Sequence, residues 1–246
     1  MKFLSIGDLH GLNVWTQFED IPQLLAGKFK PNFDKYIFVG DYTDSFSVSN
    51  VDIFNNLKQL VEFKQKYPNH VVLLLGNHDL QYWFSHQTHG CSGFRSEMYW
   101  DLNEFFRTHK DLFQIAFQHK NYLWTHAGIH RGWYEYRFPY NSNIDVAKEL
   151  NKAFLMNEKS LFDVGYSRGG FRDVGGPFWC DYRHELQHKP LKGYNQIIGH
   201  TRQLNGIAYK EFKNHTSVTC IDVLEDRNNL PNNGLYHILD LSDLNV

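Results

Sequence analysis

The hydrophobic pattern of the first third of the chain alternates between two kinds of segment. Continuous apolar runs, each ending at a glycine, predict strands over residues 2–6, 36–39 and 71–75. Apolar residues at helical spacing predict helices over residues 13–26, which Pro22 can divide, and over residues 51–67. Continuous apolar strands that alternate with helices indicate an α/β sheet covered by helices on both faces.

The pattern changes in the rest of the chain. It predicts helices over residues 97–109 and 143–156, a hairpin of strands 112–117 and 122–125, a strand over 196–198, and antiparallel strands over 206–209, 217–221 and 235–239. Residues 161–193 are rich in glycine and aromatic residues without a clear period. We therefore expect one domain over residues 1–246, with an irregular, cap-like insertion at about 161–193.

The composition has enough hydrophobic residues for a large core, and the net charge is close to zero. Hydrophobic residues make up 42% of the chain and aromatic residues 16%, and the net charge is −2. This balance argues against binding to nucleic acid or to a membrane surface. The 3 cysteines lie far apart, which argues against a disulfide framework and favours a reducing compartment. Since the sequence has no signal peptide or membrane-spanning run, we expect a cytoplasmic protein.

Polar side chains follow the first predicted strand directly. Asp8 and His10 are two positions apart, so in an extended segment they point to the same side. A carboxylate and an imidazole on one side of a strand end form half of a site for a divalent metal ion. This pair alone is weak evidence, because chance can supply it in a chain with 14 histidines.

The ends of other predicted strands carry the same chemistry. They supply Asp41 and Asp44, then Asn77 and His78, then His126, and then His200. In open α/β sheets the carboxyl ends of the strands form one crevice where ligands bind. Oxygen donors mixed with imidazoles, without a thiolate, suit Mn²⁺, Fe or Zn²⁺ better than Ca²⁺.

Taken together and in order, these motifs resemble the signature of the calcineurin-like metallophosphoesterases. The most similar branch holds Ser/Thr protein phosphatases and symmetrical diadenosine tetraphosphate hydrolases. The resemblance implies an α/β fold of two stacked mixed β-sheets flanked by helices, a four-layer sandwich. The motifs are Asp8-x-His10-Gly11, Gly40-Asp41-x-x-Asp44, Gly76-Asn77-His78-Asp79, Thr125-His126-Ala127-Gly128 and Gly199-His200-Thr201.

The resemblance also implies a pair of divalent metal ions, for which we expect Mn²⁺, with Fe or Zn²⁺ as alternatives. Asp41 would bridge the two ions, because dications about 4 Å apart repel each other and need a shared carboxylate. A hydroxide between the metals would attack phosphorus in line, without a covalent enzyme intermediate. The ligands would be Asp8, His10 and Asp41 for the first ion, and Asp41, Asn77, His126 and His200 for the second.

Two further residues receive catalytic roles from the same resemblance. His78 would donate a proton to the leaving alkoxide, and Asp44 would hold its imidazole in place. Asn77 would also contact the phosphate. Asp79, in the version of the motif that resembles the diadenosine tetraphosphate hydrolases, is a weak indication of substrate class.

The chain departs from the family pattern after Asp44. The family's second motif usually continues with Arg-Gly, and its arginine clamps the phosphate, whereas this chain has Ser45 and Phe46. A neutral hydroxyl cannot replace a bidentate guanidinium. Arg183 is the favoured replacement, because related phosphatases place a phosphate-binding arginine near this point of the chain. Weaker candidates are Arg168, Arg172 and Arg202.

The favoured function is that of a dinuclear metal-dependent phosphoesterase, either a phosphomonoesterase or a Ser/Thr-phosphatase-like enzyme. Its substrate would be a phosphorylated small molecule, a nucleotide or a protein. One alternative is a dinucleoside polyphosphate hydrolase; another is a catalytically silent scaffold, suggested only by Ser45. A nuclease or cyclic-nucleotide phosphodiesterase fits less well, because many of those enzymes have a second histidine where this chain has Arg202. The oligomeric state is left open.

Overall fold

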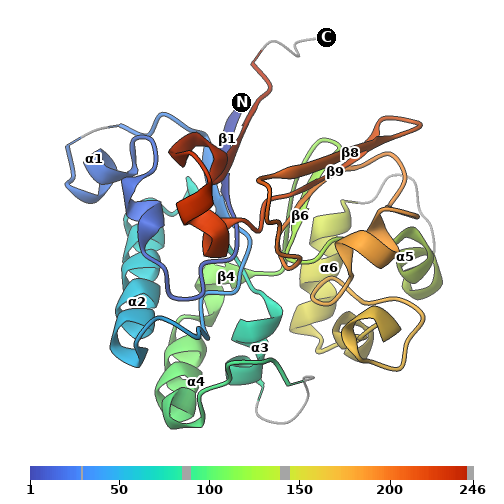
Figure 1. Ribbon diagram of the computed structural model, residues 1–246, viewed down its shortest axis with the longest axis horizontal. Coiled ribbons are helices and arrows are strands. Elements are labelled where there is room, and N and C mark those ends of the chain that lie inside the picture. The colour runs from blue at the N-terminus through green and yellow to red at the C-terminus, as the bar shows by residue number, and fades with distance from the viewer. Residues whose placement is uncertain (29, 85–89, 139–144, 243–246) are drawn as a thin grey trace.

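Two five-stranded β-sheets form the centre of the molecule, and helices cover their outer faces (Figure 1). The computed structural model describes residues 1–28, 30–84, 90–138 and 145–242. The predicted α/β fold with two stacked mixed sheets is confirmed. Among the described residues, no helix combines the length and the apolar character that crossing a membrane requires.

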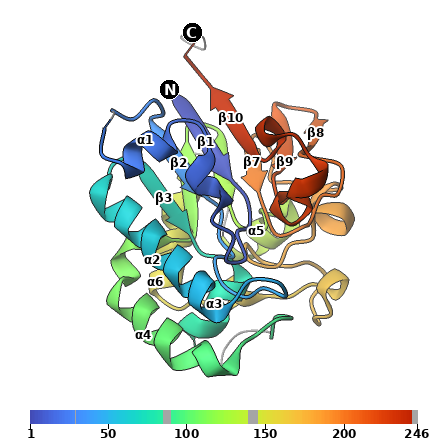
Figure 2. The ribbon, with the colours of Figure 1, turned by 60° about the vertical axis from the view of Figure 1, so that its left-hand side comes forward.

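The first sheet has the strand order β10-β1-β2-β3-β4. Its members are β1 (Lys2–Ile6), β2 (Lys35–Phe38), β3 (Val71–Leu74) and β4 (Phe113–Gln114), which run parallel, and β10 (Tyr236–Asp240), which is antiparallel to β1. Figure 2 shows β10 beside β1, so segments from the two ends of the chain are neighbours. The predicted antiparallel strand over 235–239 is therefore present, but it pairs with β1 in the first sheet and not with the two predicted strands before it.

The second sheet has the order β5-β6-β7-β9-β8. Its strands are β5 (Ala116–His119), β6 (Tyr122–Thr125), β7 (Asn195–Ile198), β8 (Ala208–Phe212) and β9 (Thr216–Cys220). Strands β6, β7 and β9 are parallel, and β5 and β8 are antiparallel to their neighbours. The predicted strand over 112–117 is in fact two strands, because the chain leaves the first sheet after β4 and enters the second at β5.

The helices are α1 (Ile21–Leu25), α2 (Asn50–Lys66), α3 (Asn77–Trp83), α4 (Tyr99–Thr108), α5 (Arg131–Arg137) and α6 (Val146–Leu155). The predicted helix over 13–26 is divided into a 3-10 helix (Val14–Gln17) and α1. Pro22 lies in the first turn of α1, where its missing N–H removes no helical hydrogen bond. The sequence pattern does not predict α3 or α5, which have only 7 residues each.

The remaining predicted helices are present with shifted ends. The predicted helix over 97–109 begins as a 3-10 turn (Ser96–Met98) before α4. The predicted helix over 143–156 corresponds to α6, and residues 143–144 lie outside the described residues. The segment predicted as a cap contains 3-10 turns (Lys159–Phe162 and Tyr166–Arg168) and one π-helix (Tyr182–Leu186). Its assignment as an insertion in a single domain stays a prediction.

Alternating side chains of the strands build separate apolar layers. Side chains from both sheets form the layer between them, with Phe3, Ile37 and Val72 from the first sheet and Trp124 and Ile197 from the second. The Trp124 indole donates a hydrogen bond to Ser5 Oγ at 2.9 Å and so links the sheets through a buried polar contact. The opposite face of the first sheet packs against apolar side chains of α2. The sheets are therefore held in a fixed relation to each other.

Neighbouring strand ends approach so closely that a methyl group does not fit between them. Gly40 follows β2 with a φ of 104°, and a Cβ built on it would lie 2.4 Å from the backbone nitrogen of Gly76 after β3. Such a contact forces the backbone to move. The absence of a side chain at Gly40 therefore determines how closely these two loops can approach each other.

We expect Gly40→Ala to lower the free energy of unfolding by more than about 3 kcal/mol, because it adds this clash to an unfavourable left-handed backbone. Gly169→Ala is the matched control: its φ is 79° and nothing lies within 4 Å of the added Cβ. It should cost only about 1–2 kcal/mol for the backbone conformation. Urea denaturation of both variants measures the difference, and equal losses would contradict the clash.

Candidate metal centre

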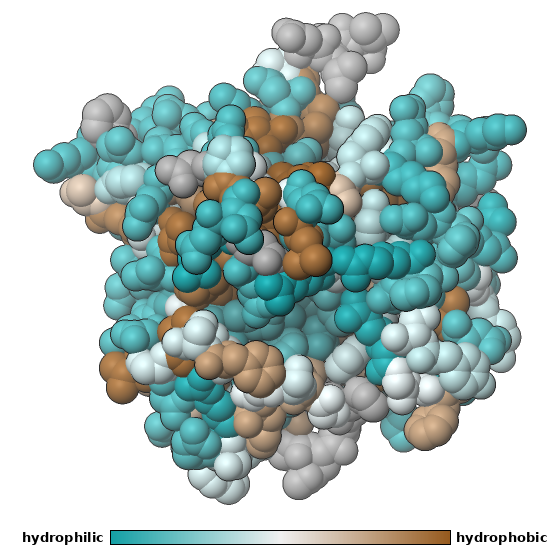
Figure 3. Space-filling model, viewed as in Figure 1, coloured by the Kyte–Doolittle hydropathy of each residue, from teal (hydrophilic) through white to brown (hydrophobic). Residues whose placement is uncertain are grey.

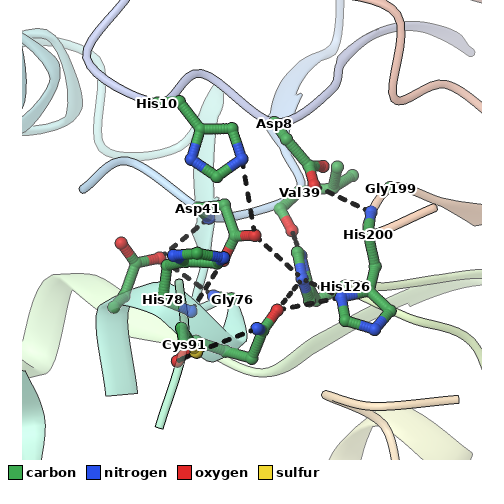
Figure 4. A network of polar contacts seen from close by, with 12 residues as sticks. Asp8, His10, Val39, Asp41, Gly76, His78, Cys91, His126, Gly199 and His200 are labelled. Atoms are coloured by element: carbon green, nitrogen blue, oxygen red, sulfur yellow. Dashed lines mark hydrogen bonds and ion pairs between the residues drawn. The ribbon is translucent and has the colours of Figure 1, made fainter. Parts of the chain in front are cut away.

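The carboxyl ends of parallel strands from both sheets meet at one place. Asp8 and His10 follow β1, Asp41 follows β2, Asn77 follows β3, His126 follows β6 and His200 follows β7. Figure 4 shows His10 and His78 on one side of Asp41, and His126 and His200 on the other. Segments almost 200 positions apart thus meet: the His200 amide donates a hydrogen bond to Asp8 Oδ2 at 2.8 Å.

The loops at this site have unusual backbone conformations. Four of the predicted site residues are non-glycine residues in the left-handed region, a conformation that costs free energy and persists only where the surroundings enforce it. The residues and their φ values are His10 (45°), Asp41 (54°), Asp44 (59°) and His200 (64°). These conformations turn the chain sharply at the strand ends. Contacts with the surrounding structure must therefore hold these loops in place.

The carboxylate of Asp79 fixes the loop after β2 against the start of α3. It accepts hydrogen bonds from the backbone N–H groups of Gly76, Asp41 and Tyr42, all at 2.9 Å, and of Thr43 at 3.2 Å. Burial and the nearby charge of Asp41 raise the pKa of Asp79 to about 7. Asp79 is fully buried, and the described residues that line the cavity do not include it. Its position therefore gives no support to its use as an indication of substrate class.

Asp41 lies between two groups of possible metal ligands. His10, Asp41 and His78 form one group, and Asp41, His126 and His200 form the other, with the ligand atoms of each within 4.8 Å of one another. Asp41 Oδ2 lies 3.4 Å from His126 Nε2 and 3.9 Å from His10 Nε2. Burial raises the pKa of Asp41, but the histidines around it outweigh burial and lower the pKa below its ordinary value.

The donor atoms of the second group carry lone pairs that face one another. His126 Nδ1 lies 2.8 Å from the Val39 carbonyl oxygen, which can only accept, so Nδ1 carries the hydrogen and Nε2 does not. Yet His126 Nε2 lies 2.8 Å from Asn77 Oδ1, which also accepts. Burial lowers the pKa of His126, so protonation does not resolve this conflict. A cation among these atoms would resolve it, and the residues present therefore fit a metal ion.

The other side of the site follows the same logic. His10 Nδ1 lies 3.1 Å from the Thr43 carbonyl oxygen, which leaves Nε2 free to face Asp41 as a metal ligand. Asp8 Oδ1 is buried and has no hydrogen-bond partner, as is also true of His200 Nε2. Burial, and then the charges of Asp222 and Asp41, raise the pKa of Asp8 well above its ordinary value. A bound cation would offset this repulsion.

His78 and Asp44 form the pair that the sequence predicts. His78 Nδ1 lies 2.8 Å from Asp44 Oδ2, and the same carboxylate also accepts hydrogen bonds from Gln81 Nε2 and the Tyr82 hydroxyl. Burial lowers the pKa of His78, but the charges of Asp41 and Asp44 outweigh burial and raise it to about 9. The Asp44 carboxylate, held by Gln81 and Tyr82, thus orients the His78 imidazole. His78 Nε2 is left for another contact.

A cavity of about 350 Å³ opens over these residues, in the hydrophilic hollow near the centre of Figure 3. Arg168 and Arg202 line it, although the sequence ranks them below Arg183. Arg183 is not among the described lining residues; its guanidinium is exposed and donates to the Arg202 carbonyl oxygen. Arg172 is ion-paired with Asp163 at 3.0 Å and is likewise absent from that lining.

Two of the lining residues that the sequence does not predict bear directly on the chemistry of the site. Asp222 comes two positions after β9 and is buried at the same end of the second sheet as His200. Burial and the charge of Asp41 raise the pKa of Asp222 to about 7. Applying the strand-end rule to the predicted strand over 217–221 would have found it. Cys91 is the second, and nothing in its local sequence marks it.

Cys91 holds the amide of Asn77 in one orientation. Asn77 Nδ2 donates a hydrogen bond to Cys91 Sγ at 3.1 Å, so Oδ1 points to His126 Nε2 and to His200 Nδ1 at 2.9 Å. If the amide turned over, its NH₂ group would face the metal position instead. The sulfur therefore selects the orientation that a metal ligand needs.

We expect Cys91→Val to weaken binding of the second metal ion by about tenfold, because valine offers no acceptor to Asn77 Nδ2. Cys91→Ser is the matched variant; it keeps an acceptor and should bind metal within about threefold of the parent protein. Calorimetric titration with Mn²⁺ measures both affinities without turnover. If valine and serine weaken binding equally, Cys91 does not orient the amide.

The fold and the site together define a class of α/β proteins with two packed sheets and metal-ligand side chains at the strand ends. The family model described as calcineurin-like phosphoesterase matches residues 1–230. The chain belongs to the calcineurin-like phosphoesterase family. This confirms the sequence resemblance, and at the level of the family it confirms the prediction of a phosphoesterase.

Individual relatives agree with this assignment. The chain is 30% identical over 197 residues to serine/threonine-protein phosphatase 2B catalytic subunit A2 of Saccharomyces cerevisiae, covering 78% of this chain and 26% of that protein. It is 33% identical over 105 residues to serine/threonine-protein phosphatase C23G10.1 of Caenorhabditis elegans, covering 40% of this chain and 21% of that protein. The matches thus span about a quarter or less of these curated relatives' length.

A solved structure shows the same fold. The structure of a cold-active protein tyrosine phosphatase matches with a TM-score of 0.54 at 17% sequence identity. The match covers 88% of this chain and 68% of the other. At this identity the match supports the architecture of two sheets and flanking helices.

Proposed function

We propose that this chain is a dinuclear metal-dependent phosphoesterase that hydrolyses phosphate monoesters in the manner of Ser/Thr phosphatases. The observation that carries the proposal is the position of Asp41, which belongs to both groups of metal-ligand side chains. The oriented His78–Asp44 pair lies beside it. A shared carboxylate with an acid at its side is the arrangement that water attack on a phosphoester requires.

The metal ions, for which Mn²⁺ is our first choice and Fe or Zn²⁺ the alternatives, would lower the pKa of a bound water and neutralise charge on the phosphate. Asp41 would be shared between them. Asp8 and His10 would complete one site, although the group of close ligand atoms around His10 contains His78 and not Asp8. Asn77, His126 and His200 would complete the other. The neutral imidazoles that burial favours at His126 and His200 leave their lone pairs available as ligands.

His78 would protonate the ester oxygen as the bond from that oxygen to phosphorus breaks. Asp44 accepts from His78 Nδ1 and so directs Nε2, the proton-donating atom, away from itself. Gln81 and Tyr82 donate to Asp44 and keep its carboxylate in place. This arrangement supplies a proton to poor leaving groups, which cannot leave as alkoxides.

The phosphate would be held by arginines that line the cavity. Arg168 donates to Thr201 Oγ1 at 2.6 Å and pairs with Asp181 at 2.9 Å, so its position is fixed beside His200. Arg202 pairs with Glu225 at 3.2 Å on the rim. Together with the Asn77 amide, these groups take the place of the arginine that the chain lacks at Ser45, and Arg183 remains the rival candidate from the sequence.

We expect His78→Ala to keep its metal ions and to lose turnover of alkyl phosphates by about 10²–10⁴-fold. Turnover of p-nitrophenyl phosphate should fall far less, because its leaving group needs no proton. Asp41→Asn should instead lose metal, since it removes the shared carboxylate. Elemental analysis and steady-state kinetics of Mn²⁺-loaded protein measure both effects.

The exposed residue His188 provides the control for this experiment: His188→Ala should match the parent protein in metal content and turnover. Full activity of His78→Ala on an alkyl phosphate would refute the general-acid role. If the metal-loaded parent protein turned over no phosphoester, the proposed function itself would be wrong. A silent scaffold would also bind metal poorly in the elemental analysis.

A second substitution series tests which arginine holds the phosphate. We expect Arg168→Ala and Arg202→Ala to raise KM, or the inhibition constant of inorganic phosphate, by about tenfold each, the loss of one charge-assisted contact. Arg107→Ala, an exposed arginine on α4, is the control for loss of charge alone. An effect of Arg183→Ala that exceeds those of Arg168→Ala and Arg202→Ala would restore Arg183 as the clamp.

A further inference from the structure

The loop after Asp44 has a rigid structure of its own. The Ser45 hydroxyl oxygen accepts hydrogen bonds from the backbone N–H groups of Ser47 and Val48, both at 3.2 Å. One residue later Ser49 caps α2 by accepting from the Asp52 amide at 3.2 Å. The side chain at the position of the missing arginine is thus committed to its own loop.

The side chain of Arg95 also fixes this loop. The guanidinium of Arg95 donates to the backbone carbonyl oxygens of Ser45 and Val48, the latter at 2.7 Å, and also to Asn50 Oδ1. Arg95 comes from the segment before α4, far from this loop in sequence. A charged side chain that bonds several backbone acceptors of one short loop holds that loop in a single conformation.

This rigid loop presents Phe46 to solvent at the edge of the cavity. The side chain is 82% exposed, and it lines the cavity together with Asp44 and His78. A single exposed phenylalanine is common on protein surfaces. A phenylalanine held at the edge of a polar cavity is different, because a substrate bound beside the metal ligands can contact its ring. Figure 3 shows apolar atoms bordering the hydrophilic hollow.

The position of Phe46 suits contact with the leaving group of the substrate. If His78 protonates the leaving oxygen, the leaving group lies on the His78–Asp44 side of the phosphorus atom. A Cβ built on Gly93 would lie 3.6 Å from Phe46 Cζ and 3.7 Å from Asp44 Cβ, so the ring lies near Asp44. The Asp44 carboxylate bonds His78 at 2.8 Å. The ring therefore lies on the side of the cavity where this leaving group would be bound. An apolar, planar leaving group would gain from contact with it.

We propose that Phe46 determines specificity for aryl phosphates, in which a planar aromatic ring is bonded directly to the ester oxygen. This inference rests on the proposed function and adds its substrate class. The ring of the leaving group would stack against Phe46 while water attacks phosphorus from the opposite side. The ester oxygen keeps the electron pair of the broken bond to phosphorus and takes a proton from His78. The loop thus replaces a phosphate contact at position 45 with a leaving-group contact at position 46.

The test uses phosphonates that are not hydrolysed, so that leaving-group reactivity does not affect the result. Benzylphosphonate resembles phenyl phosphate in shape, methylphosphonate lacks the ring, and cyclohexylmethylphosphonate has a ring of similar size that is not planar. Phe46→Ala should raise the dissociation constant of benzylphosphonate for Mn²⁺-loaded protein by about three- to tenfold, the range for one aromatic pair. The constant for methylphosphonate should change by less than about twofold.

Two further variants sharpen the result. Phe46→Leu keeps an apolar side chain and should lower the preference for benzylphosphonate over cyclohexylmethylphosphonate. Phe171→Ala removes a ring that is 89% exposed and absent from the described cavity lining, and it should behave as the parent protein. Equal changes for benzylphosphonate and methylphosphonate on Phe46→Ala would overturn the inference.

Turnover of different phosphate esters tests which kind of substrate supplies the aromatic ring. A phosphotyrosyl peptide carries its ring on the ester oxygen, whereas a nucleoside 5′-monophosphate carries its base several bonds away. Phe46→Ala should lower kcat/KM for phenyl phosphate and the phosphotyrosyl peptide by about three- to tenfold. It should leave kcat/KM for a phosphoseryl peptide and for the nucleotide unchanged. A loss confined to the nucleotide would overturn the inference, and absence of turnover on every ester would refute the proposed function instead.

Discussion

Repulsion between buried negative groups is the constraint on which this structure depends. Asp8, Asp41, Asp79 and Asp222 are all buried at the same end of the two sheets. Burial raises the pKa of Asp8 well above its ordinary value, and the charges of Asp222 and Asp41 add to this. Such a cluster persists only where hydrogen-bond donors or cations compensate it. The rest of the site can be understood as the means of compensation.

Backbone donors compensate part of the charge, and the remaining acceptors are left for cations. The Asp79 carboxylate accepts hydrogen bonds from backbone N–H groups of two loops and so fixes the positions of Asp41 and Gly76 relative to each other. Asp41 receives the His78 amide at 2.9 Å on one oxygen and leaves the other toward the histidines. The left-handed conformations and the close approach at Gly40 follow from packing these loops together. The strained backbone conformations of these loops thus bring the acceptor atoms together at one point.

The sequence predicts the elements and site residues that depend on local patterns. Apolar runs and the polar residues that follow them identify the strand ends, so Asp8, His126 and His200 are found although no local pattern shows that they meet. Patterns cannot show where a chain changes partners. The crossing between β4 and β5 needs only Ile115, whose backbone N–H donates to Asn151 Oδ1 in α6. That contact depends on the packed fold.

Residues in irregular segments escape prediction for the same reason. Arg168, Arg172 and Arg183 come from one long segment without a period, and only its folded path shows that Arg168 lines the cavity. Arg95 is equally unremarkable in sequence, yet it donates to two carbonyl oxygens of the loop after Asp44 and to Asn50 at the start of α2. The assignment of a role to such residues requires the positions of backbone carbonyls, which side-chain patterns do not contain.

The departure from the family pattern at position 45 is accompanied by a defined structure of the loop that follows Asp44. If the arginine had simply been lost, the loop after Asp44 would have no reason to keep a defined conformation. Instead the Ser45 hydroxyl and the Arg95 guanidinium hold it through four hydrogen bonds, and a fifth joins Arg95 to Asn50 at the start of α2. The Asp44–His78 pair at its start is intact. A loop that is held in this way beside the His78–Asp44 pair, with an aromatic ring at its tip, supports the proposal that the site contacts a different part of its substrate.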